Sequence, residues 1–321
     1  MSSVRRRLLV LPLALMGLFA VAAPVSAASV RDTWPVQSLH DRGANVSAIQ
    51  GLLRAHGATV EITGTFDAAT KTAVASFQAA HTLTANGIVA GATWEALVVP
   101  VKQGDSGEAV SAVQRLLVAK RHEALSVTGV FGPFTRDRVA AFQAHYGMTV
   151  WGSVGPVTWR RLVAHFQYPS FGANLCAYTV GNGNAHWATG SAIALLKAAE
   201  TAFLKLGYGR ISMGDASLEH GGDIPGHETH EQGLDIDLRL IRTDEKQCTW
   251  GTNRFWTTYD RAATRALIKT IRATAPGHVK LIYFNDPVLI REGLTTWFKG
   301  HDDHLHVRYC EASHPLAMYD C

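Results

Sequence analysis

The sequence predicts a multidomain protein in which two small all-α three-helix repeats precede an α+β domain with a small antiparallel sheet. Its 321 residues exceed the roughly 100 to 200 of a typical domain. Two segments share the same motifs at a constant offset, which indicates an internal repeat. After residue 172, helical and strand patterns mix without a regular strand–helix alternation, and this mixture is typical of an α+β fold.

The N-terminal segment has the features of a secretory signal peptide. Three arginines at positions 5 to 7 precede an apolar run over residues 8–23, and small residues follow at 25–27. A membrane anchor is the alternative, but the run is shorter than the roughly 20 residues that a spanning helix needs. We therefore expect residues 1–27 to be removed and the mature chain to be exported without a membrane segment.

The composition permits packed domains but no strong charge-driven binding. Hydrophobic residues make up 47% of the chain and charged residues 17%, which allows real cores and excludes wholesale disorder. The formal net charge of +4 falls to +1 without residues 1–27, because that segment holds three of the 30 basic residues and none of the 26 acidic ones. Lys and Arg do not cluster, so we expect no nucleic-acid partner.

The four cysteines all lie in the C-terminal half. An even number in an exported protein predicts two disulfides, for which three connectivities are possible. We favour Cys176 with Cys248 and Cys310 with Cys321, because the second bridge would close a short loop and hold the C-terminal tail. Cysteine ligation of a metal is the alternative, but no C-x-x-C spacing supports it.

The internal repeat covers residues 34–99 and 100–165, with corresponding motifs 64 to 65 residues apart. Such an offset is the length of one small structural unit, so the two segments are expected to fold alike. The matching pairs are Ala48–Leu53 with Ala112–Leu117, Gly64–Phe66 with Gly129–Phe131, Phe77-Gln78 with Phe142-Gln143, and Trp94 with Trp159.

Each repeat predicts three short helices. The first carries an apolar stripe at three- and four-residue spacing from Val46 to Leu53. Asp67 or Thr70 can cap the second helix, and the third begins near Trp94. Glycines at the junctions suit the turns between the helices.

A short linker around residues 166–174 leads into a domain expected over residues 172–321. This part is not a third copy of the repeat, because its apolar patterns change period from one segment to the next. The expected elements are helices over 188–206 and 260–273 and strands over 234–240, 280–284 and 305–309.

Five of the 15 histidines fall in two short segments, residues 226–237 and 301–306. In the first segment, aspartates alternate with leucine and isoleucine, so a strand there directs its carboxylates away from the apolar face and toward a cleft. In the second, two histidines share one strand face. Pairing these strands in one sheet would put His306 beside Asp237, with His230 supplied by the loop that precedes its strand.

His230, Asp237 and His306 form a candidate metal site. Two imidazoles and one carboxylate are a ligand set that holds a catalytic zinc ion and leaves a fourth position open. The same set suits non-haem iron, but an exported protein with disulfides favours Zn2+. The remaining alternative is a group of structural histidines, which does not explain why both strands show the pattern together.

The repeat motifs G-x-x-V-x-x-[IVL]-Q-x-L-L, G-x-F and F-Q, followed by T-W, resemble the peptidoglycan-binding type 1 module over about residues 34–165. The resemblance implies that peptidoglycan is a partner. Modules that only pack or act as spacers are the alternative. The repeated Gln, Phe and Trp residues suit a core and scaffold better than ligand contacts, so no binding residue is assigned.

The motif H-x6-D at His230 and Asp237 and the motif H-x-H at His304 and His306 resemble the lysostaphin, D-Ala-D-Ala dipeptidase and Hedgehog metallopeptidase group. Within that group the chain most resembles the penicillin-insensitive murein endopeptidases, over about residues 205–310. The supporting strings are Gly214–Ser217, Gly221-Gly222, Gly226–Asp237 and Gly300–Arg308.

Carried over by residue, the resemblance implies that the metal ligands are the three residues named above. It also implies that His304 acts as a general base or stabilises the tetrahedral intermediate, and that His301 and His227 have auxiliary catalytic roles. Asp235 and Asp302 could orient the ligating imidazoles, although structural carboxylates are an equal alternative.

The two resemblances together imply a secreted zinc-dependent peptidoglycan hydrolase of the DD-endopeptidase type. It would be located outside the cell or in the cell wall, targeted by its tandem modules, and we expect a monomer. One alternative is a zinc D-alanyl-D-alanine carboxypeptidase that acts on uncross-linked stem peptides. The other is a non-catalytic wall-binding protein, against which the intact ligand and base positions argue.

Overall fold

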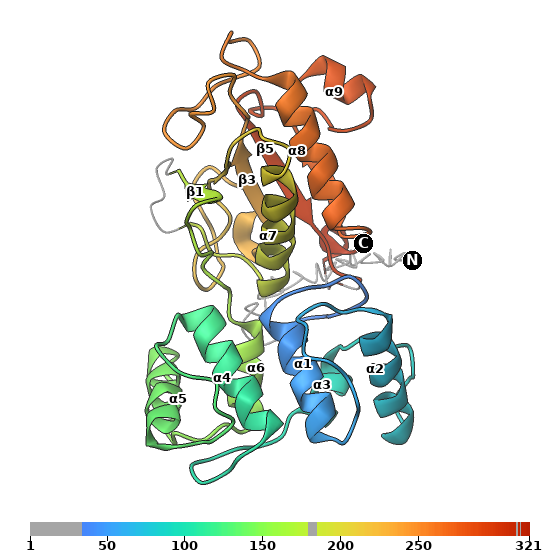
Figure 1. The fold of residues 1–321 in the computed structure, drawn as a ribbon, viewed down its shortest axis with the longest axis vertical. Coiled ribbons are helices and arrows are strands. Elements are labelled where there is room, and N and C mark those ends of the chain that lie inside the picture. Colours follow the sequence, from blue (N-terminus) through green and yellow to red (C-terminus); the bar gives the residue numbers. More distant parts are fainter. Residues whose placement is uncertain (1–33, 179–184, 313, 315) are drawn as a thin grey trace, which may run out of the picture.

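The computed structural model describes residues 34–178, 185–312, 314 and 316–321. The expected signal peptide, residues 1–27, lies outside these described residues. Figure 1 shows a helical lower half, formed by α1 to α6, and an upper half in which helices pack against a sheet. The chain thus combines an all-α repeat region with an α+β region, as the sequence predicts.

Each repeat contains the three short helices that its sequence predicts. Asp67 caps the second helix, since its Oδ1 accepts a hydrogen bond of 2.8 Å from the backbone N of Thr70. The apolar faces of both repeats join in one continuous core, so the repeats form a single packed unit. Their helices are α1 (Ala44–Ala55), α2 (Ala68–Ala80), α3 (Gly91–Leu97), α4 (Glu108–Arg121), α5 (Pro133–His145) and α6 (Pro156–Ala164).

The repeated glutamines connect a loop to the helices through buried hydrogen bonds. Gln50 Nε2 donates to Thr70 Oγ1 at 3.0 Å, and its Oε1 accepts from the backbone N of Gly64 at 2.9 Å. Gln114 makes the same two bonds in the second repeat, with Thr135 at 3.0 Å and Gly129 at 2.9 Å. A buried amide that is satisfied in this way ties a loop to two helices. This finding supports the scaffold interpretation of these residues.

The sheet has five strands in the order β1-β2-β3-β5-β4. It is mixed, and the expectation of an antiparallel sheet is wrong at one edge, where β1 and β2 run parallel. The reason is that α7 (Gly190–Leu204) connects these two strands, and parallel neighbours require such a crossover. The strands are β1 (Leu175–Ala177), β2 (Ile211–Met213), β3 (Asp235–Arg239), β4 (Val279–Tyr283) and β5 (His304–Tyr309).

The core of the α+β region lies between the sheet and two helices. Helices α7 and α8 (Arg261–Thr274) pack side by side and cover one face of the sheet (Figure 1). The apolar residues of β3, Ile236 and Leu238, are fully buried beneath them. This packing leaves the opposite face of the central strands for polar side chains. A short helix, α9 (Pro287–Arg291), follows β4 and was not expected.

The repeats dock directly on the α+β region through buried polar contacts. Ser191 Oγ at the start of α7 donates to Asp41 Oδ1 of the first repeat at 2.8 Å. His278 Nε2 lies 3.0 Å from the carbonyl oxygen of Leu39. On the second repeat, Arg121 pairs with Glu219 at 2.8 Å. The two regions therefore meet in a specific interface.

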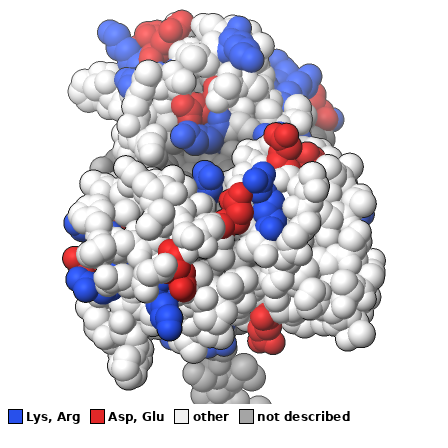
Figure 2. Space-filling view, turned by 60° about the horizontal axis from the view of Figure 1, so that its bottom comes forward, with Lys and Arg blue, Asp and Glu red and all other residues white. Residues whose placement is uncertain are grey.

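Both favoured disulfides are confirmed, Cys176–Cys248 and Cys310–Cys321. Among the described residues no helix has the length and apolar character needed to cross a bilayer. On the face shown in Figure 2, acidic and basic side chains are interspersed over a mostly uncharged surface.

Candidate metal centre

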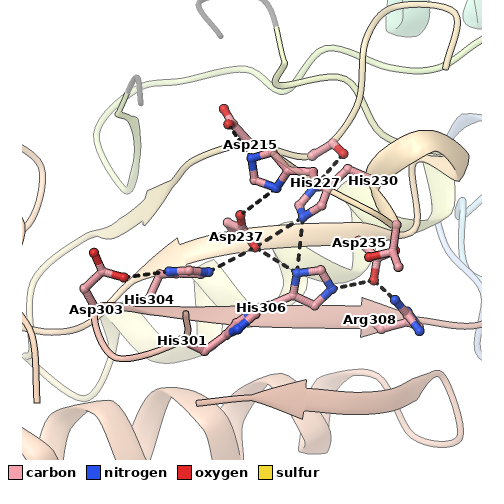
Figure 3. Close-up of polar contacts among 12 residues, drawn as sticks. Asp215, His227, His230, Asp235, Asp237, His301, Asp303, His304, His306 and Arg308 are labelled. Carbon is pink, nitrogen blue, oxygen red and sulfur yellow. Dashed lines mark hydrogen bonds and ion pairs between the residues drawn. The ribbon is translucent and has the colours of Figure 1, made fainter. Parts of the chain in front are cut away.

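The polar face of β3 and β5 carries the candidate site. In the antiparallel register of these strands Asp237 lies opposite His306, the neighbour pair that the sequence predicts. Figure 3 shows four histidines converging on Asp237 from this sheet and from the chain just before β3. The sequence predicts that both aspartates of β3 face a cleft, but both are buried. Only Asp237 reaches the cleft, because Asp235 is fully enclosed.

His230 is delivered by a single 3-10 turn, His230–Gln232, immediately before β3. The turn ends at Gly233, whose φ of 65° is a left-handed conformation that favours glycine. A Cβ at this position would also lie 2.8 Å from the ring of Phe166. The geometry of this turn therefore requires glycine and fixes the direction in which the His230 ring points.

Hydrogen bonds set the tautomers of the two histidines nearest Asp237. His230 Nδ1 donates to the carbonyl oxygen of Ala216 at 2.7 Å, and His306 Nε2 donates to Asp235 Oδ1 at 2.8 Å. The other nitrogens, His230 Nε2 and His306 Nδ1, lie 3.2 Å from each other. Asp237 Oδ1 lies 3.5 Å from the first and 3.1 Å from the second.

With these two nitrogens deprotonated, three electron-pair donors converge on one point, where a cation could bind between them. Ligands about 2.0 to 2.1 Å from a zinc ion at tetrahedral angles are about 3.3 Å apart, close to the spacing found here. Asp237 Oδ1 is buried and makes no well-aligned hydrogen bond among the described residues, so it is available as a ligand. His230, Asp237 and His306 fit a tetrahedral metal site.

The charges of the cluster agree with this interpretation. Burial alone would raise the pKa of Asp237, but His230 and His304 outweigh it and hold that pKa well below its usual range. Burial likewise opposes a charge on His306, yet the hydrogen bond to Asp235 and the nearby carboxylate of Asp237 raise its pKa to about 9. Without a metal the cluster therefore keeps a proton at neutral pH. A metal ion would have to displace that proton, which makes its affinity pH-dependent.

His304 lies beside the candidate ligands and is held by a carboxylate. Its Nδ1 lies 2.8 Å from Asp303 Oδ1, and its Nε2 lies 3.9 Å from Asp237 Oδ1. Burial disfavours its charged form, but Asp237 and Asp303 together raise its pKa. The ring therefore points its Nε2 toward the centre, and this nitrogen is within reach of a molecule bound there.

His227 and His301 flank the centre on opposite sides. His227 Nε2 lies 3.1 Å from Asp215 Oδ2, a hydrogen bond that raises the pKa of His227, and its Nδ1 lies 3.8 Å from Asp237 Oδ2. His301 makes no direct polar contact with Asp237, but its ring centroid is 4.7 Å from that of His304. Burial, with a contribution from His304, lowers the pKa of His301 to about 4, so it is neutral at physiological pH.

A second ligand set overlaps the first. Atoms of His227, His230 and Asp237 that can bind a metal lie within 4.8 Å of one another. His306 fits better as the third ligand, because its nitrogen is within 3.2 Å of His230 and 3.1 Å of Asp237. His227 is already engaged by Asp215. We therefore assign His227 a place beside the ligands.

Of the two carboxylates expected to orient imidazoles, one does so and the other does not. Asp235 accepts the hydrogen bond from His306, but Asp302 pairs with Arg254 at 2.6 Å and contacts no histidine of the centre. The reason is that Asp302 lies in the loop before β5, where the strand periodicity that places His304 and His306 does not apply. Asp302 therefore corresponds to the alternative of a structural carboxylate.

Two contacts were missed. Tyr319, from the C-terminal tail, donates to Asp235 Oδ2 at 2.7 Å, and Asp215 holds His227. Asp215 stands in a glycine-flanked string that the sequence singles out, but no pattern indicated its partner. Tyr319 is 84 residues from Asp235 and carries no local signal.

The centre opens into a cleft of about 1050 Å³. Asp237, His227 and His304 line it, whereas His230 and His306 lie buried beneath. The far wall is formed by the chain after β3, which contributes Trp250 and Trp256, both largely exposed. A chain-like ligand in the cleft can thus approach the centre from the side of Asp237.

Comparison with known families identifies the repeats. The family described as "Putative peptidoglycan binding domain" matches residues 42–97 and 106–162, which lie within the two expected repeats. The match supports peptidoglycan as a partner and an association with the cell wall. With the two disulfides, it is consistent with an extracellular or cell-wall location. No curated protein matches the chain.

Proposed function

We propose that this protein is a secreted zinc-dependent hydrolase that cleaves amide bonds in the peptide cross-links of peptidoglycan, in the manner of a DD-endopeptidase. The observation that carries the proposal is the convergence of His230 Nε2, His306 Nδ1 and Asp237 Oδ1 at 3.1 to 3.5 Å from one another. A zinc ion held by these atoms supplies Lewis acidity, which polarises a carbonyl group and makes water acidic near neutral pH.

The surrounding residues then move protons and fix orientations. His304 Nε2 takes the proton of the attacking water and passes it to the leaving amine, while Asp303 holds the ring in place through Nδ1. His227, anchored by Asp215, would donate a hydrogen bond to the carbonyl oxygen of the scissile amide. His301 is neutral and packs against His304, which limits the positions of that ring.

The two peptidoglycan-binding modules would hold the cleft close to its substrate. Docked on the same chain as the cleft, they raise the local concentration of wall peptides around it without any added contact at the site. This coupling favours a wall polymer over free peptides as the substrate.

The direct test is metal content and wall hydrolysis in the full mature chain. In His306→Ala, elemental analysis should find no bound zinc. Muropeptide release should fall by more than about 100-fold, because loss of a residue that only orients a ligand already costs about 10- to 100-fold. His81→Ala, an exposed histidine of the first repeat, is the matched control and should retain both. Full hydrolysis by His306→Ala would refute the proposal.

The product distinguishes this function from its alternatives. A defined cross-linked dimer should be cut, whereas rapid release of a single D-alanine from a pentapeptide with no cut of the dimer would identify a carboxypeptidase. Strong wall binding with no metal and no product would identify a non-catalytic binding protein.

A further inference from the structure

Arg239 occupies a position next to the candidate centre that the proposed chemistry does not use. It follows Asp237 by two residues on β3, so both side chains leave the same face of the strand. In the register with β5 it lies opposite His304. Arg239 also lines the same cleft as Asp237 and His304. Arg239 therefore lines the same cleft through which a molecule would approach Asp237.

The Arg239 side chain is held in place but makes no ion pair with a described residue. Its guanidinium lies over the ring of Tyr178, 4.2 Å from the centroid, and Nη1 donates to the carbonyl oxygen of Gln247 at 3.0 Å. Among the described residues no carboxylate lies within ion-pair distance of it. Two other arginines nearby are neutralised: Arg242 by Asp244 at 2.7 Å, and Arg308 by Asp235 at 2.7 Å.

Arg239 is half-buried, and its guanidinium makes no ion pair with a described carboxylate, so it can still form one with a bound anion. With a divalent cation bound at the adjacent centre, the local excess of positive charge would increase further. The planar guanidinium, already oriented by Tyr178, can offer parallel N–H donors to a carboxylate.

We propose that Arg239 forms a subsite that binds a free carboxylate of the substrate peptide close to the scissile amide. This inference rests on the proposed function and specifies its substrate class. Residues two apart on a strand are about 7 Å apart, which is the span of about two residues of extended peptide. The bound carboxylate thus belongs to the residue at the cut or to its neighbour. Trp250 and Trp256 also line the cleft.

Two wall peptides carry such a carboxylate. One is the terminal carboxylate of an uncross-linked stem peptide, and the other is the carboxylate beside the linking amine of a diamino acid in a cross-link. The experiment therefore uses four substrates with the zinc-loaded full mature chain: a pentapeptide and a cross-linked dimer, each with this carboxylate either free or amidated.

Arg239→Gln should lower kcat/KM about 10- to 100-fold on the free-carboxylate form of the preferred substrate, and by less than about threefold on its amide. Arg239→Lys keeps the charge without the planar fork and should fall between. Lys246→Gln removes a charge from the same cleft and should change kcat/KM by no more than about threefold on every substrate. The pair that shows the effect, pentapeptide or dimer, identifies the source of the carboxylate. An equal loss on free and amidated forms would overturn the inference.

Binding provides a readout that does not depend on turnover. Titration of the same peptides, followed by the fluorescence of the cleft tryptophans, should show that Arg239→Gln weakens binding of the free carboxylate by a similar factor and leaves the amide unchanged. If the wild-type chain cuts none of the substrates, the proposed function fails, yet this titration still decides the role of Arg239. Equal affinity of wild type and Arg239→Gln for the free carboxylate would refute that role.

Discussion

Asp235 shows how a residue outside the ligand set can control it. Its Oδ1 accepts from His306 Nε2 at 2.8 Å and from Arg308 Nε at 2.7 Å, and its Oδ2 accepts from Tyr319 at 2.7 Å. The carboxylate is fully buried, so burial raises its pKa, but His306 and Arg308 outweigh that effect and the net shift is downward. An ionised Asp235 holds the proton on His306 Nε2 and leaves Nδ1 available to a metal.

Replacing that carboxylate should weaken metal binding while leaving the ligands in place. The neutral amide in Asp235→Asn is a weaker hydrogen-bond acceptor for His306 and Arg308 than the carboxylate. We therefore expect zinc affinity, measured in competition with a chelator, to fall about 10- to 100-fold. Asp302→Asn is the matched control, because Asp302 pairs with Arg254 outside the centre. Unchanged affinity in Asp235→Asn, or an equal loss in the control, would show that Asp235 does not position His306.

Strands that are long enough to show an alternating pattern could be predicted from the sequence, and shorter strands could not. The alternation along β3 and β5 is long enough to place Asp237 beside His306. Strands β1 and β2 have three residues each, too few to show a period, and their parallel pairing depends on the crossover through α7. The contact of Tyr319 with Asp235 comes from tertiary packing of the tail, which no local pattern encodes.

The C-terminal tail should contribute to both stability and metal binding. The Cys310–Cys321 disulfide closes a segment of 11 residues around the 3-10 turn that places Tyr319. Replacing both cysteines by serine should lower the free energy of unfolding by about 3 kcal/mol in a loop-entropy model, and weaken zinc binding because Tyr319 is released.

The second disulfide provides the control for this prediction. Cys176–Cys248 spans 72 residues, so its removal should lower the free energy of unfolding by about 4 kcal/mol. It does not hold the tail, and the zinc affinity of the folded fraction should stay unchanged. Loss of zinc affinity in both double variants alike would indicate a general loosening of the fold in place of a specific role for the tail.

Across the whole molecule, buried carboxyl groups at the interface between the repeats and the α+β region make the stability of the protein depend on pH. Glu311 is buried there, and burial, with a contribution from Asp41, raises its pKa to about 8 from a usual value of 4.5. Between these values the folded chain binds a proton that the unfolded chain does not. Stability from this group is therefore complete below pH 4.5 and declines as pH rises toward 8.

Glu311→Gln should remove this dependence, because the amide does not ionise. Relative to the wild type, its free energy of unfolding should rise progressively between pH 5 and pH 8, by up to about 1.4 kcal/mol per pH unit. The melting temperature should rise with it. Glu61→Gln, an exposed glutamate of the first repeat, should run parallel to the wild type. A constant difference between Glu311→Gln and wild type at all pH values would contradict the assignment.

The docking of the repeats has a geometric consequence. Ser191, Asp41 and His278 join the two regions through buried contacts, so the separation between wall-binding modules and cleft is set by the fold and not by a flexible tether. A molecule anchored on the wall would then reach only those bonds that lie at one fixed distance and direction from its anchor. The proposed hydrolysis would then follow the regular spacing of the polymer, and each new cut would require the modules to dissociate and rebind.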